Sequence, residues 1–189
     1  SIKLDGHELS AIRTRDLRKN VAAVRQDIQL FSANLEFNVS LGNPDISQGD
    51  CAEATAMVRA EGLVERLGWE HTVRERGVDL SVGEAQLITF ARAMAHRPVI
   101  VIMDEATASI DSVTEQRIRE ATAAIMETKT AIVIAHRLST IQSADRILVM
   151  DQGEIVESGT HDSLMGRAGA YAALVAASEA VVEGVASSV

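Results

Sequence analysis

The chain contains 189 residues, of which 47% are hydrophobic but only 3% aromatic, and its formal net charge is −9. This length is sufficient for one domain with a substantial core, and the composition predicts aliphatic α/β packing. The acidic balance argues against a nucleic-acid-binding surface, which needs clustered lysine and arginine. No apolar run approaches the roughly 20 residues that cross a bilayer, so we expect any membrane association to depend on a partner or on another segment.

The N-terminal part predicts two short strands with a basic helical stretch between them. Residues 2–4 predict the first strand, which ends in an Asp5-Gly6 turn. Val21–Val24 predicts the second strand, which leads to Gln26. A glutamine there can offer its carbonyl oxygen to Mg²⁺ or water and its amide to phosphate. Four basic residues between the strands are interpreted as a solvated face: Arg13, Arg15, Arg18 and Lys19.

A helix-rich region is predicted over Ser47–Gly68, and we expect Trp69 to pack within it. The segment Leu80–Gln86, with the sequence LSVGEAQ, then leads into a predicted helix over Glu84–His96, whose apolar residues have helical spacing. The free N–H groups of such a helix start, together with the Ser81 hydroxyl, are typical of an anion-binding site. In isolation, an ordinary helix cap would explain this segment, but the acidic strand end that follows it in the chain favours the functional interpretation.

The apolar run Val99–Met103 is rich in β-branched residues and predicts a strand that is buried on both faces. The run stops at Asp104 and Glu105. Open α/β sheets bind their ligands at the carboxyl ends of parallel strands. An acid there can hold Mg²⁺ through water, and its neighbour can orient or deprotonate a water molecule. Alone, this pair would also fit a solvated strand end.

The C-terminal part predicts further α/β structure. Ser112 and Glu115 have the spacing of a capping box at the start of a helix. Thr130–Ala135 predicts a strand that leads to His136, where a histidine beside the carboxylate pair could reach a phosphate. The remaining predicted elements are a hairpin over 147–157, two helices over 161–177 and a disordered tail over 178–189.

These motifs resemble those of ATP-binding cassette (ABC) ATPases in order and spacing over most of the chain. The segments VRERG (73–77) and AHRLSTI (135–141) resemble exporters in particular. The resemblance covers the Walker B strand with its catalytic glutamate (Val99–Glu105), the signature loop (Leu80–Gln86), the D-loop (Ala108–Asp111), the Q-loop glutamine (Gln26) and the switch histidine (His136).

The resemblance implies ATP hydrolysis with Mg²⁺ as the metal cofactor. It assigns Asp104 to Mg²⁺ through water, with Gln26 as a further metal contact, and Glu105 to the role of general base. His136 and Gln26 would order the γ-phosphate and the attacking water. Contacts to the ATP of an opposing subunit would come from the signature loop and the D-loop, through Ser81, Gly83, Glu84, Gln86 and Asp111.

The sequence also departs from the family's pattern. No G-x-x-x-x-G-K-[ST] phosphate-binding loop occurs in it, so we expect the chain to correspond to the C-terminal three-quarters of a nucleotide-binding domain and to be inactive alone. Within the signature, Val82 replaces a glycine, and Glu84-Ala85 replaces Gln-Arg. The carboxylate of Glu84 would place a negative charge near the γ-phosphate. Arg74 also stands where the family has glycine.

The predicted fold class is therefore α/β, a P-loop NTPase-like, mostly parallel sheet with flanking helices and a helical subdomain, truncated at its N-terminus. The predicted divisions are a partial ATPase core with the Q-loop (1–40), a helical subdomain with the signature loop (41–96), the ATPase core with Walker B, D-loop and switch histidine (97–177), and the tail (178–189).

The leading functional hypothesis is the ATP-hydrolysing motor domain of an ABC exporter at the cytoplasmic face of a membrane. Its expected partners are the transmembrane domain of the same transporter and a second nucleotide-binding domain in a head-to-tail dimer, with no nucleic acid. One alternative is an ABC-type ATPase of DNA repair or translation, against which the exporter-like segments and the acidic charge count. The other is a non-catalytic fragment that pairs with a complete partner, which the missing phosphate-binding loop favours.

Overall fold

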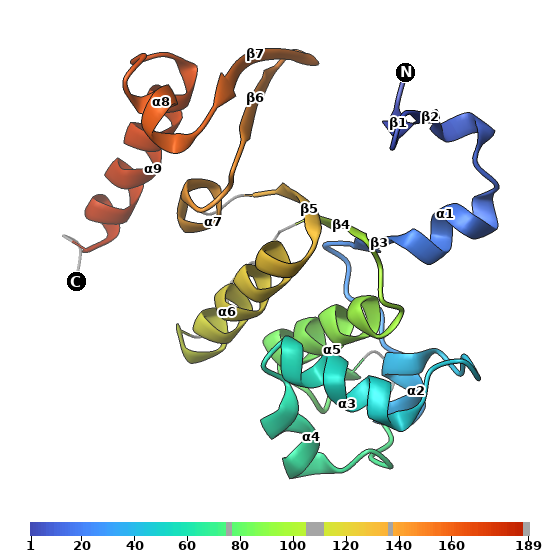
Figure 1. Cartoon of the computed structure of the whole chain (residues 1–189). Helices are drawn as coiled ribbons and strands as arrows, with labels where there is room; N and C mark the ends of the chain where they lie inside the picture. The colour runs from blue at the N-terminus through green and yellow to red at the C-terminus, as the bar shows by residue number, and fades with distance from the viewer. Residues whose placement is uncertain (75–76, 105–111, 136–137, 187–189) are drawn as a thin grey trace. The chain divides into compact units, whose positions relative to one another are not determined.

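The computed structural model describes residues 1–74, 77–104, 112–135 and 138–186. The chain divides into two compact units, Ser1–Ile134 and Ala135–Val189. Figure 1 labels their helices and strands. Within the described ranges, no helix is long and apolar enough to cross a membrane.

The first unit is built on a three-stranded parallel sheet in the order β3-β4-β5. Its strands are β3 (Val21–Val24), β4 (Ile100–Asp104) and β5 (Thr130–Ile134). They lie in level register, since Ile100 pairs with both Val21 and Thr130. The three predicted strands are thus confirmed within a residue at each end.

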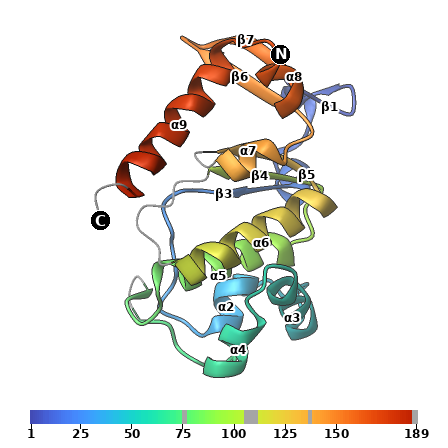
Figure 2. The ribbon, with the colours of Figure 1, turned by 90° about the vertical axis from the view of Figure 1, so that its left-hand side faces the viewer.

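Helices α5 (Val82–Ala95) and α6 (Ser112–Thr128) both lie on one face of this sheet (Figure 2). The prediction that β4 is buried on both faces is therefore only partly right. Alternate residues of a strand point to opposite faces, and only the helix-facing residues Val101 and Met103 are fully buried. The core between sheet and helices is formed by Val24, Val101 and Met103 with Leu87, Ile88, Ala91, Met94, Ile118, Ala121 and Ile125.

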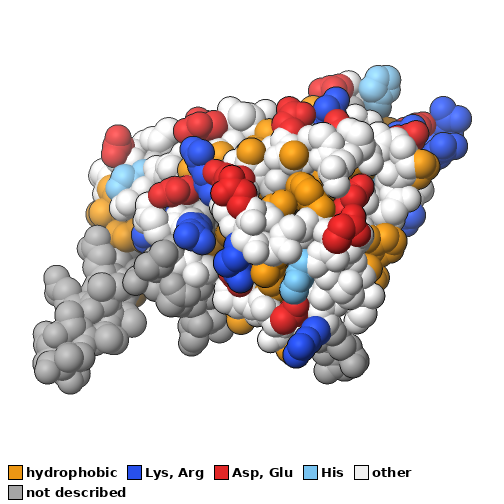
Figure 3. Space-filling view, turned by 90° about the horizontal axis from the view of Figure 1, so that it is seen from below, with side chains coloured by type: hydrophobic (Ala, Val, Ile, Leu, Met, Phe, Trp, Pro, Cys, Tyr) orange, Lys and Arg blue, Asp and Glu red, His pale blue; other side chains and the backbone are white. Residues whose placement is uncertain are grey.

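A second helical layer covers the other side of α5. It contains α2 (Leu35–Ser40), α3 (Gln48–Met57) and α4 (Glu61–Leu67), all of which lie below α5 in Figures 1 and 2. The predicted helical region is confirmed, although it is two helices, separated by Arg59 with a left-handed φ of 59°. Trp69 packs against the core as expected. Figure 3 looks onto this layer and shows basic, acidic and apolar side chains interspersed on its surface.

The second layer shares its hydrophobic core with the sheet. Val39, Val58 and Leu63 belong to the same cluster of buried side chains as Val24 and Val101. The sequence-based boundaries near residues 40 and 97 therefore lie inside one compact unit.

The N-terminal segment is a small hairpin followed by short helices. Strands β1 (Lys3–Leu4) and β2 (His7–Glu8) are antiparallel, and the turn between them places Asp5 and Gly6 at φ 48° and 82°, as a type I′ turn requires. The helices are η1 (Leu9–Ala11) and α1 (Thr14–Asn20), which leads directly into β3.

The second unit contains α7 (Leu138–Gln142), the antiparallel hairpin of β6 (Ile147–Asp151) and β7 (Glu154–Gly159), α8 (His161–Met165) and α9 (Ala170–Ala186). The predicted hairpin and helix pair are present. Helix α9 extends to Ala186, well past the residue where the sequence predicted a tail, because this alanine-rich stretch has a high helix propensity. The small core of this unit contains Ile147, Val149, Leu164, Tyr171 and Val175.

Candidate functional site

Two predicted site residues lie at the carboxyl edge of the parallel sheet. Asp104 is the last residue of β4, and its side chain is half-buried. Strand β3 ends beside it, with Val24 paired to Met103, and the exposed Gln26 follows two residues later. The structure therefore brings Gln26 and Asp104 to one edge of the sheet. Glu105, Asp111 and His136 lie outside the described residues.

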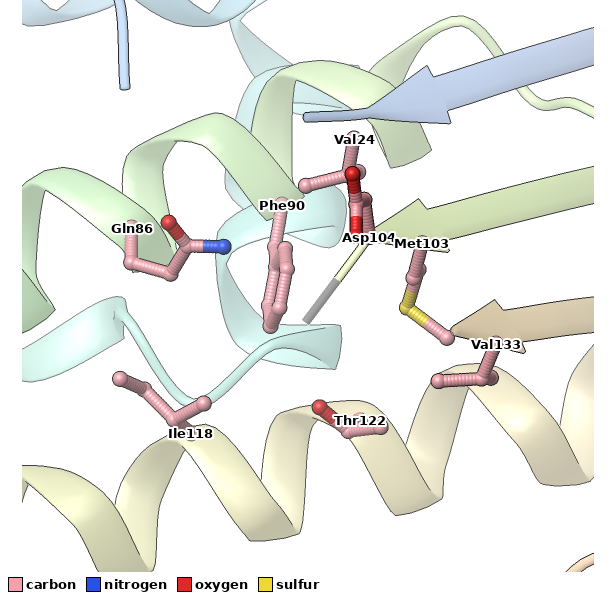
Figure 4. Close-up of a pocket in the computed structure, with 8 residues that line it drawn as sticks. All are labelled: Val24, Gln86, Phe90, Met103, Asp104, Ile118, Thr122 and Val133. Atoms are coloured by element: carbon pink, nitrogen blue, oxygen red, sulfur yellow. The ribbon is translucent and has the colours of Figure 1, made fainter. Parts of the chain in front are cut away.

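The side chain of Gln86 is buried inside the first compact unit, Ser1–Ile134. Its side chain and that of Asp104 line the same small cavity of about 10 Å³ (Figure 4). Gln86 is only 8% exposed and Thr122, across the cavity, only 4%. Neither side chain hydrogen-bonds to a described residue. The family resemblance implied a nucleotide contact for Gln86; in the structure its side chain lies in the core between α5, α6 and β4.

The start of α5 is capped by its own side chains. The Ser81 Oγ accepts a hydrogen bond from the Glu84 N–H at 3.2 Å, and Glu84 Oε2 accepts one from the Ser81 N–H at 2.9 Å. This reciprocal capping box leaves the N–H groups of Val82 and Gly83 without a partner among the described residues. Ser81 itself is exposed. Val82 is exposed as well, whereas Gly83 is buried. The free amides and the Ser81 hydroxyl, at the positive end of a 14-residue helix, fit a phosphate group that approaches from the side of Ser81 and Val82.

The carboxylate of Glu84 is neutralised by a residue that sequence reasoning missed. Arg66, in the last turn of α4, approaches Glu84 Oε1 with its Nη2 at 2.5 Å. The negative charge expected near a bound phosphate is thus paired with a cation. The two residues are 18 positions apart on different helices, so no local sequence pattern connects them.

The segment before α5 is held by hydrogen bonds to Asp79. Its Oδ2 lies 2.8 Å from His71 Nε2, and its Oδ1 accepts the Arg74 N–H at 2.9 Å. Burial raises the pKa of Asp79, but the hydrogen bonds from His71 and Arg74 outweigh this effect and hold the pKa below its ordinary value. Asp79 lies two residues before Ser81, so these contacts position the entrance to the signature loop.

Glycine is required at position 77 in the same segment. Gly77 has a left-handed φ of 70°, and a Cβ there would lie 3.0 Å from the Leu30 side chain. The segment that precedes the signature loop therefore packs closely on the segment that follows Gln26.

Arg92 of α5 connects the signature helix to the segment after Gln26. Its Nε donates to the Asn38 carbonyl at 2.7 Å, and its Nη1 donates to the Gln29 carbonyl at 2.8 Å. The guanidinium also lies 5.5 Å from the centre of the Phe31 ring. Burial lowers the pKa of Arg92. Sequence reasoning missed this arginine because its partners are more than 50 residues away.

Known proteins share sequence with this chain over most of its length. The family profile described as "ABC transporter" matches residues 1–108. The uncharacterized ABC transporter ATP-binding protein YknV of Bacillus subtilis (strain 168) is 43% identical, covering 94% of this chain and 30% of that protein. The probable multidrug resistance ABC transporter ATP-binding/permease protein YheH of the same organism is 45% identical, covering 90% of this chain and 26% of that protein.

A solved structure supports the same relationship. A bacterial Atm1-family ABC exporter with ATP bound has a TM-score of 0.82 and 37% identity, covering 92% of this chain and 31% of that chain. The likeness confirms the predicted α/β, P-loop NTPase-like fold. The chain spans less than a third of the length of these three proteins. With the profile match over more than half of its residues, the chain belongs to the ABC transporter family.

Proposed function

We propose that this chain is the ATP-binding and ATP-hydrolysing portion of an ABC exporter, in which hydrolysis drives the transport of a substrate across a membrane. The observation that carries the proposal is that one compact unit holds both Asp104 at the carboxyl edge of its sheet and an open, capped helix start at Ser81. The names of the relatives support an exporter, since one is called an ATP-binding/permease protein and a solved one an exporter with ATP bound.

The residues of the sheet edge fit a magnesium-dependent hydrolysis. The half-buried carboxylate of Asp104 has no partner among the described residues, and carboxylate oxygen is the ligand that Mg²⁺ prefers. Asp104 would hold the ion through water, and the ion would neutralise phosphate charge. Glu105 would accept a proton from the attacking water, and Gln26 and His136 would order that water and the γ-phosphate.

The signature loop would act on the ATP of a second subunit. Ser81 and the amides of Val82 and Gly83 would hold the γ-phosphate, and Asp111 would connect the two sites. This arrangement requires a head-to-tail dimer, in which the same surface of each subunit meets the other across a two-fold axis. The exposure of Ser81 and Val82, the latter 57% exposed, supports an intermolecular role.

An apolar surface next to the Gln26 segment would contact the transmembrane domain. Phe31, Phe37 and Leu41 are 48%, 39% and 42% exposed, and exposed apolar side chains that lie together are typical of protein-contact surfaces. The two phenylalanine rings contact edge-to-face with their centres 6.0 Å apart, and the Arg92 guanidinium lies over the Phe31 ring. The cytoplasmic side of a transporter's membrane domain is the partner we propose for this surface.

We further propose that the chain does not hydrolyse ATP by itself, because its sequence contains no phosphate-binding loop with its lysine.

A hydrolysis assay tests these proposals. The chain is assayed alone and joined to a phosphate-binding segment taken from a relative. We expect no magnesium-dependent turnover from the chain alone, and turnover from the joined protein. In the joined protein, Glu105→Gln should lower turnover by about 10²–10⁴-fold with little change in ATP affinity, because the amide keeps the shape but cannot accept the proton. A decrease of less than about tenfold would exclude Glu105 as the base. ATP binding without turnover by the joined protein would contradict the proposed ATPase function.

A further inference from the structure

A basic pocket lies away from the residues discussed above. It has a volume of about 570 Å³ and is formed by α1, the loop between α2 and α3 with the first turn of α3, and the end of α5 with the two residues that follow it. Four cationic side chains line it: Arg15, Arg18, Lys19 and Arg97. The sequence pattern suggested a solvated face for the α1 residues, and all of them are exposed in the structure. Three of them also line one cavity.

The three cations of α1 are not neutralised by the protein. Arg15, Arg18 and Lys19 form no ion pair or hydrogen bond with any residue that the structure describes. Arg18 and Lys19 lie three and four positions after Arg15, so both are neighbours of Arg15 on the helix surface, where like charges repel and destabilise the helix. Helix α1 has seven residues and none is buried. Packing therefore contributes little that could offset this repulsion.

The two carboxylates of the pocket do not cancel this charge. Asp50 accepts hydrogen bonds from the Ser47 N–H and hydroxyl at 2.8 and 2.6 Å, and forms an ion pair with Arg97 at 2.6 Å. Arg97 also pairs with Glu53 at 3.3 Å, outside the pocket lining, so its charge is already neutralised and adds nothing to the excess. Asp45 is the other carboxylate of the lining, so the three cations of α1 face one acid and the formal excess is two positive charges.

The pocket also offers neutral hydrogen-bond donors. The Asn43 side chain uses its Oδ1 to accept the Asp45 N–H at 3.0 Å, which leaves its NH₂ group available. The Thr14 hydroxyl lines the same cavity. The His96 ring adds no positive charge at neutral pH, because burial and the nearby Arg92 lower its pKa.

We propose that this pocket binds a phosphate group, carried by a small soluble molecule or by a lipid headgroup. An excess of two positive charges matches a phosphate dianion, and guanidinium groups bind phosphate oxygens in a bidentate manner. The volume lies in the range of about 300–1,000 Å³ that is typical of small-ligand sites. The proposal rests on α1 and on residues 43–50 and 95–97, and does not depend on the proposed ATPase function.

Titration of the full chain with inorganic phosphate, followed by the NMR shifts of backbone amides at constant ionic strength, tests the proposal. We expect saturable shifts confined to residues 14–20, 43–50 and 95–97. The double variant Arg15→Gln/Arg18→Gln should weaken the affinity at least about tenfold, because each bidentate charged contact contributes strongly to phosphate binding. Arg13→Gln is the matched control: Arg13 precedes the same helix but pairs with Asp16 at 2.9 Å and does not line the pocket, so it should leave the affinity unchanged.

A loss of phosphate binding could also result from misfolding of the variant, so a variant that is expected to bind phosphate more tightly is tested as well. Asp45→Asn removes the remaining free carboxylate and should strengthen phosphate binding. Shifts that do not saturate, or an affinity that the double variant leaves unchanged, would overturn the proposal.

Vesicles of phosphatidylcholine with and without phosphatidic acid then distinguish the two sources of the phosphate group. Arginine-dependent binding only to the phosphatidic acid vesicles, reversed by inorganic phosphate, would identify a lipid headgroup. Binding of phosphate without binding of vesicles would identify a soluble phosphate compound.

Discussion

Arg66 in α4 and Glu84 in α5 form an ion pair with 2.5 Å between Nη2 and Oε1, and this pair joins two helices at the start of the signature helix. It changes the expected electrostatics of the loop, because the carboxylate that replaces a glutamine in the signature is charge-neutralised within its own subunit. The same carboxylate also caps the Ser81 N–H. Glu84 therefore has a structural role, which its position in the motif did not reveal.

A double-mutant cycle measures the coupling free energy between Arg66 and Glu84. The two side chains are 54% and 22% exposed, so we expect a coupling free energy of no more than about 1 kcal/mol between Arg66→Ala and Glu84→Gln, decreasing with added salt. Urea denaturation of the wild type, both single variants and the double variant gives this value. A coupling of zero would show that the ion pair does not hold the helices together in solution.

Replacement of Gln86 tests whether its amide is satisfied in the core. A buried amide without a partner costs about 1–3 kcal/mol, and methionine has a similar volume without the polar atoms. We therefore expect Gln86→Met to increase the free energy of unfolding by about 1 kcal/mol. Thermal melting gives the sign directly. A decrease would mean that the amide has a hydrogen-bond partner, such as water in the small cavity beside Asp104.

Replacement of Arg92 by lysine, although conservative in charge, should destabilise the protein. A lysine cannot donate simultaneously to the Asn38 and Gln29 carbonyls, and Asn38 is completely buried. We expect Arg92→Lys to reduce the free energy of unfolding by about 1–3 kcal/mol. The control is Arg97→Lys, since Arg97 is 69% exposed and pairs with Asp50 and Glu53 at the surface. That change should cost less than about 1 kcal/mol, and equal losses in the two variants would argue against a special role for Arg92.

The stability of the protein should fall in alkaline solution through Cys51. Burial raises the pKa of this thiol from 9.0 to about 11, and the negative charges of Glu36 and Asp50 add to the effect. Because the pKa is raised in the folded state, the stabilising contribution is intact below pH 9.0 and is lost as the pH rises to about 11. Cys51→Ala should show a smaller loss of stability over this range than the wild type in pH-dependent denaturation. Parallel profiles would contradict the assignment.

The predicted elements that proved right are those whose evidence is local. The apolar runs at 21–24, 99–103 and 130–135 and the helical spacing of residues 87–95 each depend on neighbours within a few residues, and the structure confirms all four elements. The ends of the parallel strands also followed from the sequence, which placed Asp104 and Gln26 at one edge of the sheet.

The sequence by itself determined the family, the strands and helices, and which motifs lie at the sheet edge, because the residues of each motif are adjacent in the chain. Only the tertiary structure decided that α5 and α6 cover the same face of β4, that Gln86 is buried, and that Arg66 neutralises Glu84. It also decided that the basic residues of α1 line a pocket. Each of these features depends on which side of an element meets another element distant in sequence, and burial and charge pairing are properties of that contact rather than of either segment alone.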